Sequence, residues 1–155
     1  MDFIDNRTRA IGAMALDGLQ ERAKAISANT VNVLTPNYQR KEVSFENSLR
    51  NVIERENEKE AIKLQNSAMY NQNPKSVLQG QSPAQIAFLN TAYEEGYSIN
   101  IENDTSEALG LDGNNVNLES EMMDEAKTGM QYQVIASLLS KSYAMMNTII
   151  KGQNQ

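Results

Sequence analysis

The C-terminal end of the chain carries the pattern of one long amphipathic helix. Apolar residues recur there at alternating steps of four and three, at Tyr132, Ala136, Leu139, Tyr143, Met146 and Ile150. Because an α-helix turns once in about 3.6 residues, this spacing places them along a single seam. Asn117 is a suitable N-cap for such a helix. At about 1.5 Å per residue, a helix from 118 to 150 extends roughly 50 Å, which is more than a compact domain of this size can enclose.

A second seam follows the N-terminal segment from 9 to 33. It consists of residues at the same spacing, Leu16, Leu19, Ala23 and Ile26. Thr35-Pro36 ends the helix, because proline lacks an amide hydrogen and disfavours helical geometry in the residue before it. We therefore predict a mainly α fold in which the N- and C-terminal helices pair as an antiparallel coiled coil. Residues flanking the seams are expected to stay exposed for neighbouring subunits, namely Ile11, Ala15, Ile135, Leu138 and Ile149.

Two features of the terminal helices leave alternatives open. Gly12 and Gly129 lie on the seams, where each glycine lowers helix stability by about 1 kcal/mol relative to alanine. They indicate either a close helix crossing or tolerated surface glycines. Six of the eight methionines also lie in these helices. They are either ordinary core residues or adaptable contacts for several non-identical neighbours.

The middle of the chain is more polar and its pattern is weaker. Residues 44 to 70 predict one or two helices, and 71 to 82 have the composition of a linker. Ser82 followed by Pro83 is a typical helix start, so a short helix is predicted from 83 to 95. Residues 97 to 102 alternate apolar and polar side chains, which favours a short strand or hairpin. The chain thus divides into an N-terminal assembly segment (1–40), an intervening region (41–115) and a C-terminal assembly helix (116–152).

Composition excludes most catalytic chemistry. The chain has no cysteine and no histidine, so thiolate nucleophiles, imidazole bases and the usual transition-metal ligands are missing. Its net charge of -6 argues against a nucleic-acid partner. We predict no enzyme activity, no cofactor and no metal site. The segment Met1–Arg7 does not have the pattern of a cleavable signal peptide, and no apolar run is long enough to span a membrane.

Two polar clusters have a structural interpretation. The acidic residues Glu54, Glu56, Glu58 and Glu60 alternate with basic ones, which is typical of a solvated helix face rather than a carboxylate site. The segment from Asp112 to Asn117 has a partial likeness to a calcium loop, but its glycine is misplaced and position twelve would be Met123. A turn leading into the last helix is therefore predicted there.

A short motif follows the N-terminal helix. Its matching positions are Asn29, Asn32, Val33, Thr35, Pro36, Tyr38 and Arg40. In order and spacing the segment resembles the N-terminal signature of flagellar rod and hook proteins, approximately N-x-x-N-x-x-T-P-G-Y-x-R. Leu34 stands where the family usually has asparagine, and Asn37 where it has glycine. Asparagine adopts positive φ more readily than other non-glycine residues, so the turn is expected to be kept.

A second motif precedes the C-terminal helix. It consists of Asp112, Gly113, Asn114, Asn115 and Val116, followed by Leu118, Glu121, Met122, Tyr132-Gln133 and Ile150-Lys151-Gly152. It resembles the C-terminal signature of the proximal rod members of that family. The two signatures cover about the first 40 and the last 40 residues, and 41 to 111 carry no matching motif.

The resemblance implies a structural subunit of the flagellar basal-body rod. Such subunits polymerise into a helical tube that transmits torque and encloses an export channel. The implied partners are copies of the chain, other rod proteins, the membrane-ring and adaptor proteins at the rod base, and the flagellar type III export apparatus. The implied location is extracytoplasmic, reached without a cleaved signal peptide. The alternative from another class is an acidic helical export chaperone or adaptor that binds one partner.

Overall fold

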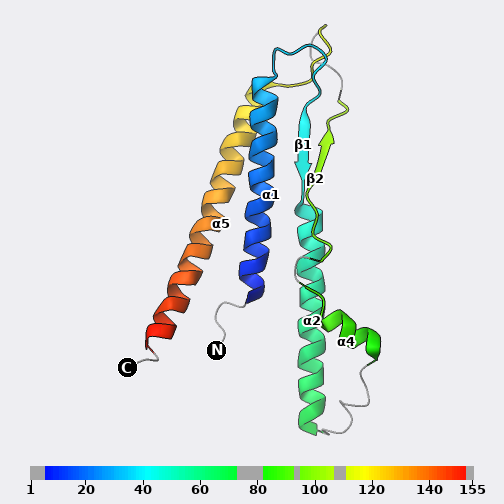
Figure 1. The fold of residues 1–155 in the computed structure, drawn as a ribbon, viewed down its shortest axis with the longest axis vertical. Helices are drawn as coiled ribbons and strands as arrows, with labels where there is room; N and C mark the ends of the chain where they lie inside the picture. The colour runs from blue at the N-terminus through cyan, green and yellow to red at the C-terminus, as the bar shows by residue number, and fades with distance from the viewer. Residues whose placement is uncertain (1–5, 73–81, 93–94, 107–110, 153–155) are drawn as a thin grey trace.

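The computed structural model of the chain describes residues 6–72, 82–92, 95–106 and 111–152. The helices are α1 (Asn6–Val31), α2 (Glu46–Gln72), α4 (Pro83–Leu89) and α5 (Leu118–Gly152). The strands are β1 (Lys41–Ser44) and β2 (Asn100–Asn103). The prediction of a mainly α fold with two long terminal helices and a less regular middle is confirmed. Figure 1 shows α1 and α5 side by side, with α2 extending beyond them at the end that holds both termini.

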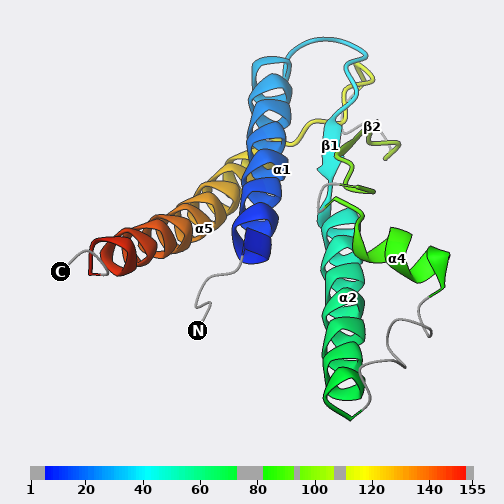
Figure 2. The same ribbon diagram turned by 60° about the horizontal axis from the view of Figure 1, so that its bottom comes forward.

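The two terminal helices run antiparallel and contact each other along their length. Close approach is visible at Gly12, where a Cβ atom would lie 2.8 Å from Cδ2 of Leu139. No neighbour lies within 4 Å of the corresponding position at Gly129 among the described residues. Figure 2 shows α5 diverging from α1 toward its C-terminus. The two helices thus approach closely at Gly12 and Leu139, although their axes diverge toward the C-terminus of α5.

The core lies where α1 meets β1 and the start of α2. Leu19, Ala25, Val43 and Phe45 form its buried cluster, and Ile135 of α5 packs against it. The Phe45 ring occupies the space where a side chain on Gly18 would stand. The guanidinium of Arg22 lies 4.9 Å from the centroid of the same ring. Because α1 has neighbours on two sides, its buried arc is wider than one coiled-coil seam.

The two strands form a small antiparallel sheet. Val43 is opposite Ile101, and Lys41 is opposite Asn103. The predicted strand at 97 to 102 is found at 100 to 103, and its partner β1 was not predicted. Val43 is the only apolar residue of β1, so the strand has no alternating pattern to detect.

Helix α2 is a single helix of 27 residues. Glu54, Glu58 and Glu60 are exposed as predicted, but the prediction of a solvated face is wrong for Glu56, which is 4% exposed. Its Oε1 lies 2.6 Å from Nζ of Lys59, itself 3% exposed. Lys59 also donates to the carbonyl of Thr91, so the chain beyond α4 covers this pair.

Helix α4 begins as predicted and ends earlier. Ser82 and Gln85 form the expected capping box, with Pro83 in the first turn. The helix ends at Leu89 instead of 95, and residues 93–94 lie outside the described part of the chain. Most of the linker predicted at 71 to 82 also lies outside it, as do residues 1–5. None of the described helices combines the length and the apolar character that a membrane crossing requires.

Candidate functional site

The two sequence motifs meet at one end of the molecule, where α1 ends and α5 begins (Figure 1). We call the residues 29–41 and 112–121 together the motif junction. The Asn37 amide donates to the carbonyl of Asp112 over 2.8 Å. Asn37 has φ of 58° and Gly113 has φ of 76°. A Cβ on Gly113 would lie 2.5 Å from Oδ1 of Asn37, so each loop needs its own left-handed residue to approach the other.

Asn114 closes the end of α1. Its side-chain nitrogen lies 2.9, 3.1 and 2.9 Å from the carbonyl oxygens of Asn32, Val33 and Thr35. These carbonyls belong to the turn that follows α1, so this buried amide holds the turn together. Its Oδ1 accepts from the amide of Val116 at 2.8 Å. One side chain thus ties the exit of α1 to the entrance of α5.

Asn115 joins the same entrance to the sheet. Its Oδ1 accepts from the Arg40 amide at 2.6 Å, and its Nδ2 donates to the Asp104 carbonyl at 2.9 Å. The Asp104 amide in turn donates to the carbonyl of Arg40 over 2.7 Å. Asn115 therefore binds the residue before β1 and the residue after β2, which lie at the same end of the sheet.

The centre of the motif junction is buried and polar. Asn29 and Glu121 are both 0% exposed. Oδ1 of Asn29 accepts from the Lys41 amide at 2.8 Å and from the Tyr38 hydroxyl at 3.3 Å. Its Nδ2 donates to the Lys41 carbonyl at 2.9 Å and to Oε2 of Glu121 at 3.1 Å. Every donor and acceptor of this asparagine is used, which a buried amide requires.

Arg40 supplies the counter-charge. Its Nε lies 2.5 Å from Oε1 of Glu121, and other guanidinium nitrogens lie 3.2 Å from Asp124 and 3.5 Å from Asp104. Burial lowers the pKa of Arg40, but the hydrogen bond and charge of Glu121, with the charges of Glu42 and Asp104, outweigh it, so the pKa is raised. Burial and the Glu121 charge together raise the pKa of Tyr38. The carboxylates around Arg40 thus favour its charged form.

The other N-terminal motif residues shape the turn after α1. Asn32 donates to the Ala28 carbonyl at 2.8 Å, and Oγ1 of Thr35 donates to Oδ1 of Asn32 at 3.1 Å. The Tyr38 amide donates to the Thr35 carbonyl over 3.3 Å. Val33 is half-buried and Pro36 is exposed, and their side chains have no described polar role.

The seam residues are distributed over buried and exposed positions. On α1, Leu19 and Ile26 are buried, Leu16 is half-buried and Ala23 is exposed. On α5, Ala136, Leu139 and Met146 are half-buried, whereas Tyr132 and Tyr143 are 43% and 53% exposed. The side chain of Ile150 lies outside the described residues.

The face of α5 toward α1 is rotated by about one residue from the seam that periodicity indicates. Its buried positions are Glu121, Thr128 and Ser142, which are polar. Of the residues flanking the seams, Ala15 is buried, Ile11 and Ile135 are half-buried, and Leu138 is 62% exposed. A pattern of apolar residues could not indicate a contact face whose centre is polar.

Three residues that contact the motif junction or belong to it were not among the predicted assembly residues. They are Glu121, Asp104 and Asp124, the carboxylates around Arg40. Glu121 is one of the residues that match the second motif, and this match was the only sign in the sequence that it has a role in the site. Within the described residues, no group of three acidic side chains is arranged to hold a metal ion. What the arrangement provides is a rigid connection between two helices and a sheet.

No model of a known protein family matches the chain. Over 139 residues it is 28% identical to the flagellar basal body rod protein FlgB of Bacillus subtilis, covering 89% of this chain and 88% of that protein. It is 29% identical over 140 residues to FlgB of Borrelia hermsii and 25% identical over 136 residues to FlgB of Borreliella burgdorferi. The likeness therefore extends well beyond the two motifs, through the intervening region in which no motif was recognised. The resemblance to flagellar rod proteins is confirmed, and the proteins that this chain resembles over nearly its whole length are FlgB flagellar basal body rod proteins.

Proposed function

We propose that the chain is a structural subunit of the proximal flagellar rod, which polymerises into a helical tube that transmits torque and encloses the export channel. The names of its relatives support the rod assignment. The observation that carries polymerisation is the surface of α5. This helix has large apolar side chains on two sides that α1 leaves exposed.

The uncovered sides of α5 lie on either side of its contact with α1. One is an apolar stripe with large exposed side chains, Met130, Val134, Leu138 and Met145, which are 63%, 58%, 62% and 43% exposed. The other contains Met122, Tyr132 and Tyr143, at 62%, 43% and 53%. Exposed apolar area on this scale is typical of a surface that another protein covers. Two such stripes give each subunit different neighbours on its two sides, which is how open helical assemblies form.

The motif junction contributes stiffness to this assembly. Glu121, Asn29 and Arg40 fix the ends of α1 and α5 to each other through buried hydrogen bonds. A buried charged network is best attested as a device that sets register between helices. The terminal segments 1–40 and 116–152 would then form the assembly unit, with 41–115 attached through the sheet. Torque transmission needs such rigidity and no catalysis.

The partners in this proposal are copies of the chain, other rod proteins, the membrane-ring and adaptor proteins at the rod base, and the flagellar type III export apparatus. The proposed location is the extracytoplasmic part of the basal body. Met130 and Met145 in the apolar stripe support contacts with several non-identical neighbours, because flexible thioether side chains adapt to different surfaces.

Cosedimentation with purified basal bodies tests the proposal. The wild-type chain is expected in the basal-body fraction, and Tyr132→Ser combined with Tyr143→Ser should lower its amount at least about tenfold, since each change removes buried aromatic area. Leu64→Ser on α2, where the side chain is 72% exposed, is the matched control and should leave the amount unchanged. Circular dichroism should show equal helicity for all variants. A wild-type chain absent from basal bodies, and instead bound to one exported protein in fixed stoichiometry, would identify an export chaperone.

A further inference from the structure

Two strongly exposed leucines lie in the motif junction or directly beside it. Leu34 is 87% exposed and Leu111 is 111% exposed, the highest value among the large apolar residues that the structure describes. They lie on loops joined by the hydrogen bond from the Asn37 amide to the Asp112 carbonyl. We call Leu34 and Leu111, with the described loop residues 32–37 and 112–117 beside them, the apolar tip. It lies at the end of the molecule opposite the two termini (Figure 1).

Backbone contacts hold the loops beside both leucines of the apolar tip. Asn114 holds the carbonyls on both sides of Leu34, and Gly113 is fixed against Asn37 two residues after Leu111. Neither leucine contributes to the core of its own chain. A preorganised apolar side chain loses little conformational entropy on docking, which favours its use as an anchor.

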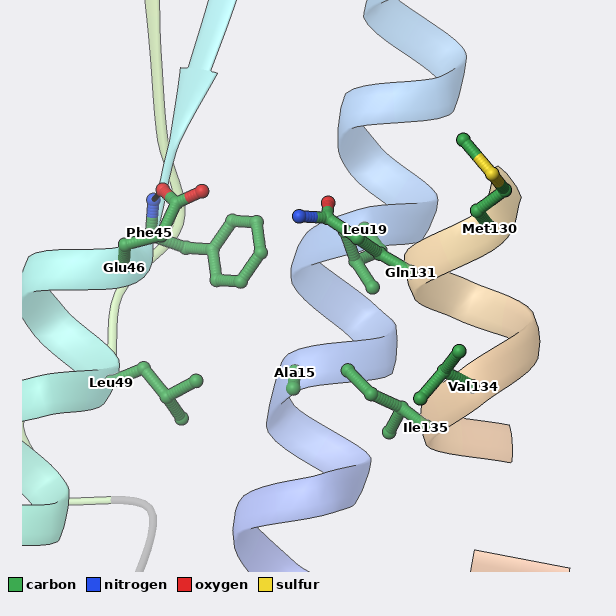
Figure 3. Close-up of a pocket in the computed structure, with 9 residues that line it drawn as sticks. All are labelled: Ala15, Leu19, Phe45, Glu46, Leu49, Met130, Gln131, Val134 and Ile135. Atoms are coloured by element: carbon green, nitrogen blue, oxygen red, sulfur yellow. Dashed lines mark hydrogen bonds between the residues drawn. The ribbon is translucent and has the colours of Figure 1, made fainter. Parts of the chain in front are cut away.

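An apolar groove lies at the other end of the helix pair. It has a volume of about 520 Å³ and is formed by Ile11, Gly12, Leu138, Leu139 and Met145 with Thr8 and Lys141 at its rim. We call it the terminal groove. It continues toward a central groove of about 390 Å³, with which it shares Ala15 and Ile135. Figure 3 shows the central groove, with Phe45 and Leu49 on the α2 side and Val134 and Ile135 on α5.

The groove and the tip match in chemistry as well as in size. A space of 520 Å³ is within the range of pockets that bury whole drug-sized molecules, so two leucine side chains fit. Lys141 is the only charged residue that lines the terminal groove, and it is the only one in the sequence from 128 to 150. Asp112, next to Leu111, is exposed and acidic. An apolar contact with an acidic residue beside it thus meets an apolar groove with a basic residue at its rim.

We infer that the apolar tip of one copy of this chain docks into the terminal groove of the next copy, with Asp112 facing Lys141. This inference rests on the proposed function and specifies one of its subunit contacts. The apolar tip and the terminal groove are different surfaces at opposite ends of the molecule, so the contact is heterologous. It leaves a free tip at one end of the assembly and a free groove at the other. Repeated docking therefore extends the assembly along the molecule's length. Leu34, which stands where related rod proteins usually have asparagine, is part of the contact.

Disulfide cross-linking tests the contact directly, because the native chain has no cysteine. Mild oxidation of the purified double variant Leu111→Cys with Leu138→Cys should give a ladder of covalent oligomers. A mixture of the two single variants should stop at the mixed dimer, identified by mass spectrometry of the joined peptides. The control replaces Leu138→Cys by Leu64→Cys, whose position on α2 is 72% exposed against 62% for Leu138 and lies outside the groove.

A second measurement does not depend on cross-linking. Leu34→Asn with Leu111→Asn should raise the dissociation constant for self-association at least about tenfold by sedimentation velocity, because two buried leucines are lost. Lys141→Glu should weaken association most at low salt. Leu64→Asn should have no effect.

The outcomes separate this inference from the proposed function. Dimers joined only through Leu111→Cys on both copies, or a cross-linking rate equal to the control, would overturn tip-to-groove docking. If the wild-type chain still cosediments with basal bodies, the rod assignment survives that result. If the ladder forms but the chain is absent from basal bodies, the docking contact stands and the rod assignment fails.

Discussion

At the scale of single residues, Asn29 shows how one side chain can replace part of a sheet. Its amide pairs with both the amide and the carbonyl of Lys41, at 2.8 and 2.9 Å, in the way that a neighbouring strand would. The same amide reaches Glu121 on α5. An asparagine is required because only an amide both donates and accepts in these directions. A carboxylate there would place a second negative charge beside Glu121.

Arg40 is expected to be the most sensitive residue of the motif junction. Arg40→Met leaves Glu121 at 0% exposure without its cation, and breaking a buried ion pair from one side lowers stability by about 3 kcal/mol or more. The free energy of unfolding from urea titration measures this loss. Arg50→Met, on the exposed face of α2, is the control and should change it by less than about 0.5 kcal/mol.

The double variant Arg40→Met with Glu121→Gln should recover part of that loss, because the uncompensated charge is gone. Equal stability of Arg40→Met and the wild-type chain would show that Glu121 finds another partner.

The stability of the motif junction is expected to depend on acid pH. The hydrogen bond from the Ser106 amide comes first among the causes that hold the pKa of Asp104 below its usual value, and Arg40 adds to it. A carboxylate with a lowered folded-state pKa stabilises the fold above its unfolded pKa of about 3.9, and this contribution is lost as pH falls through the lower folded value. Burial raises the pKa of Glu46, but the hydrogen bond from Arg22, backbone hydrogen bonds and the Arg22 charge together outweigh it, so the pKa is lowered.

Unfolding free energies measured between pH 6 and pH 2 check this. Below pH about 4, the unfolding free energy should fall less steeply with decreasing pH in Asp104→Asn than in the wild-type chain. Glu119→Gln, at an exposed position outside the Arg40 cluster, should keep the wild-type slope. Identical slopes for all three proteins would remove Asp104 from the acid response.

At the scale of secondary structure, periodicity and caps predicted the elements that depend on local sequence. The terminal helices, the Asn117 cap and the Ser82 capping box are present, with the Asn117 side chain 3.0 Å from the Glu119 amide. Strand β1 was not predicted, because its partner residues in β2 are 56 or more positions away in the sequence and Val43 is its only apolar residue. The α5 face that contacts α1 differs from the predicted seam, because the polar residues Glu121, Thr128 and Ser142 are buried there and a pattern of apolar residues does not show them. Glu56 was missed for the same reason.

Glycine positions in the terminal helices give a prediction at this scale. Gly129 has open space where a Cβ would stand, so Gly129→Ala should stabilise the isolated chain by about 0.5–1 kcal/mol through helix propensity. Gly12→Ala should give no such gain, because its Cβ would lie 2.8 Å from the Leu139 side chain. If Gly129 marks a close crossing in the assembly, Gly129→Ala should at the same time lower incorporation into basal bodies.

Thermal unfolding and basal-body cosedimentation of the two variants measure these opposite effects. Ala136→Gly provides the reverse change one heptad further along α5 and should destabilise the isolated chain. Normal incorporation of Gly129→Ala would favour the interpretation of Gly129 as a tolerated surface glycine.

At the scale of the whole molecule, the interactions are distributed unevenly along the helix pair. Buried polar bonds fasten α1 to α5 at the motif junction, whereas the other end has the open terminal groove and the divergence seen in Figure 2. Local opening needs less free energy where few apolar contacts and no buried network are broken. The isolated subunit is thus expected to be firm at the apolar tip and loose at the terminal groove. Docking a tip into that groove would join the firmest part of one copy to the loosest part of the next.

Hydrogen exchange at two protein concentrations tests this coupling. In dilute solution, amides from 137 to 146 of α5 should exchange at least about tenfold faster than those from 124 to 128, since they open locally. At a concentration where the chain self-associates, the first group should slow markedly, while amides from 50 to 59 of α2 should not change. Leu34→Asn with Leu111→Asn should abolish the concentration dependence without altering the dilute pattern. Uniform protection along α5 in dilute solution would mean that the monomer is already rigid, and assembly would then have no loose end to order.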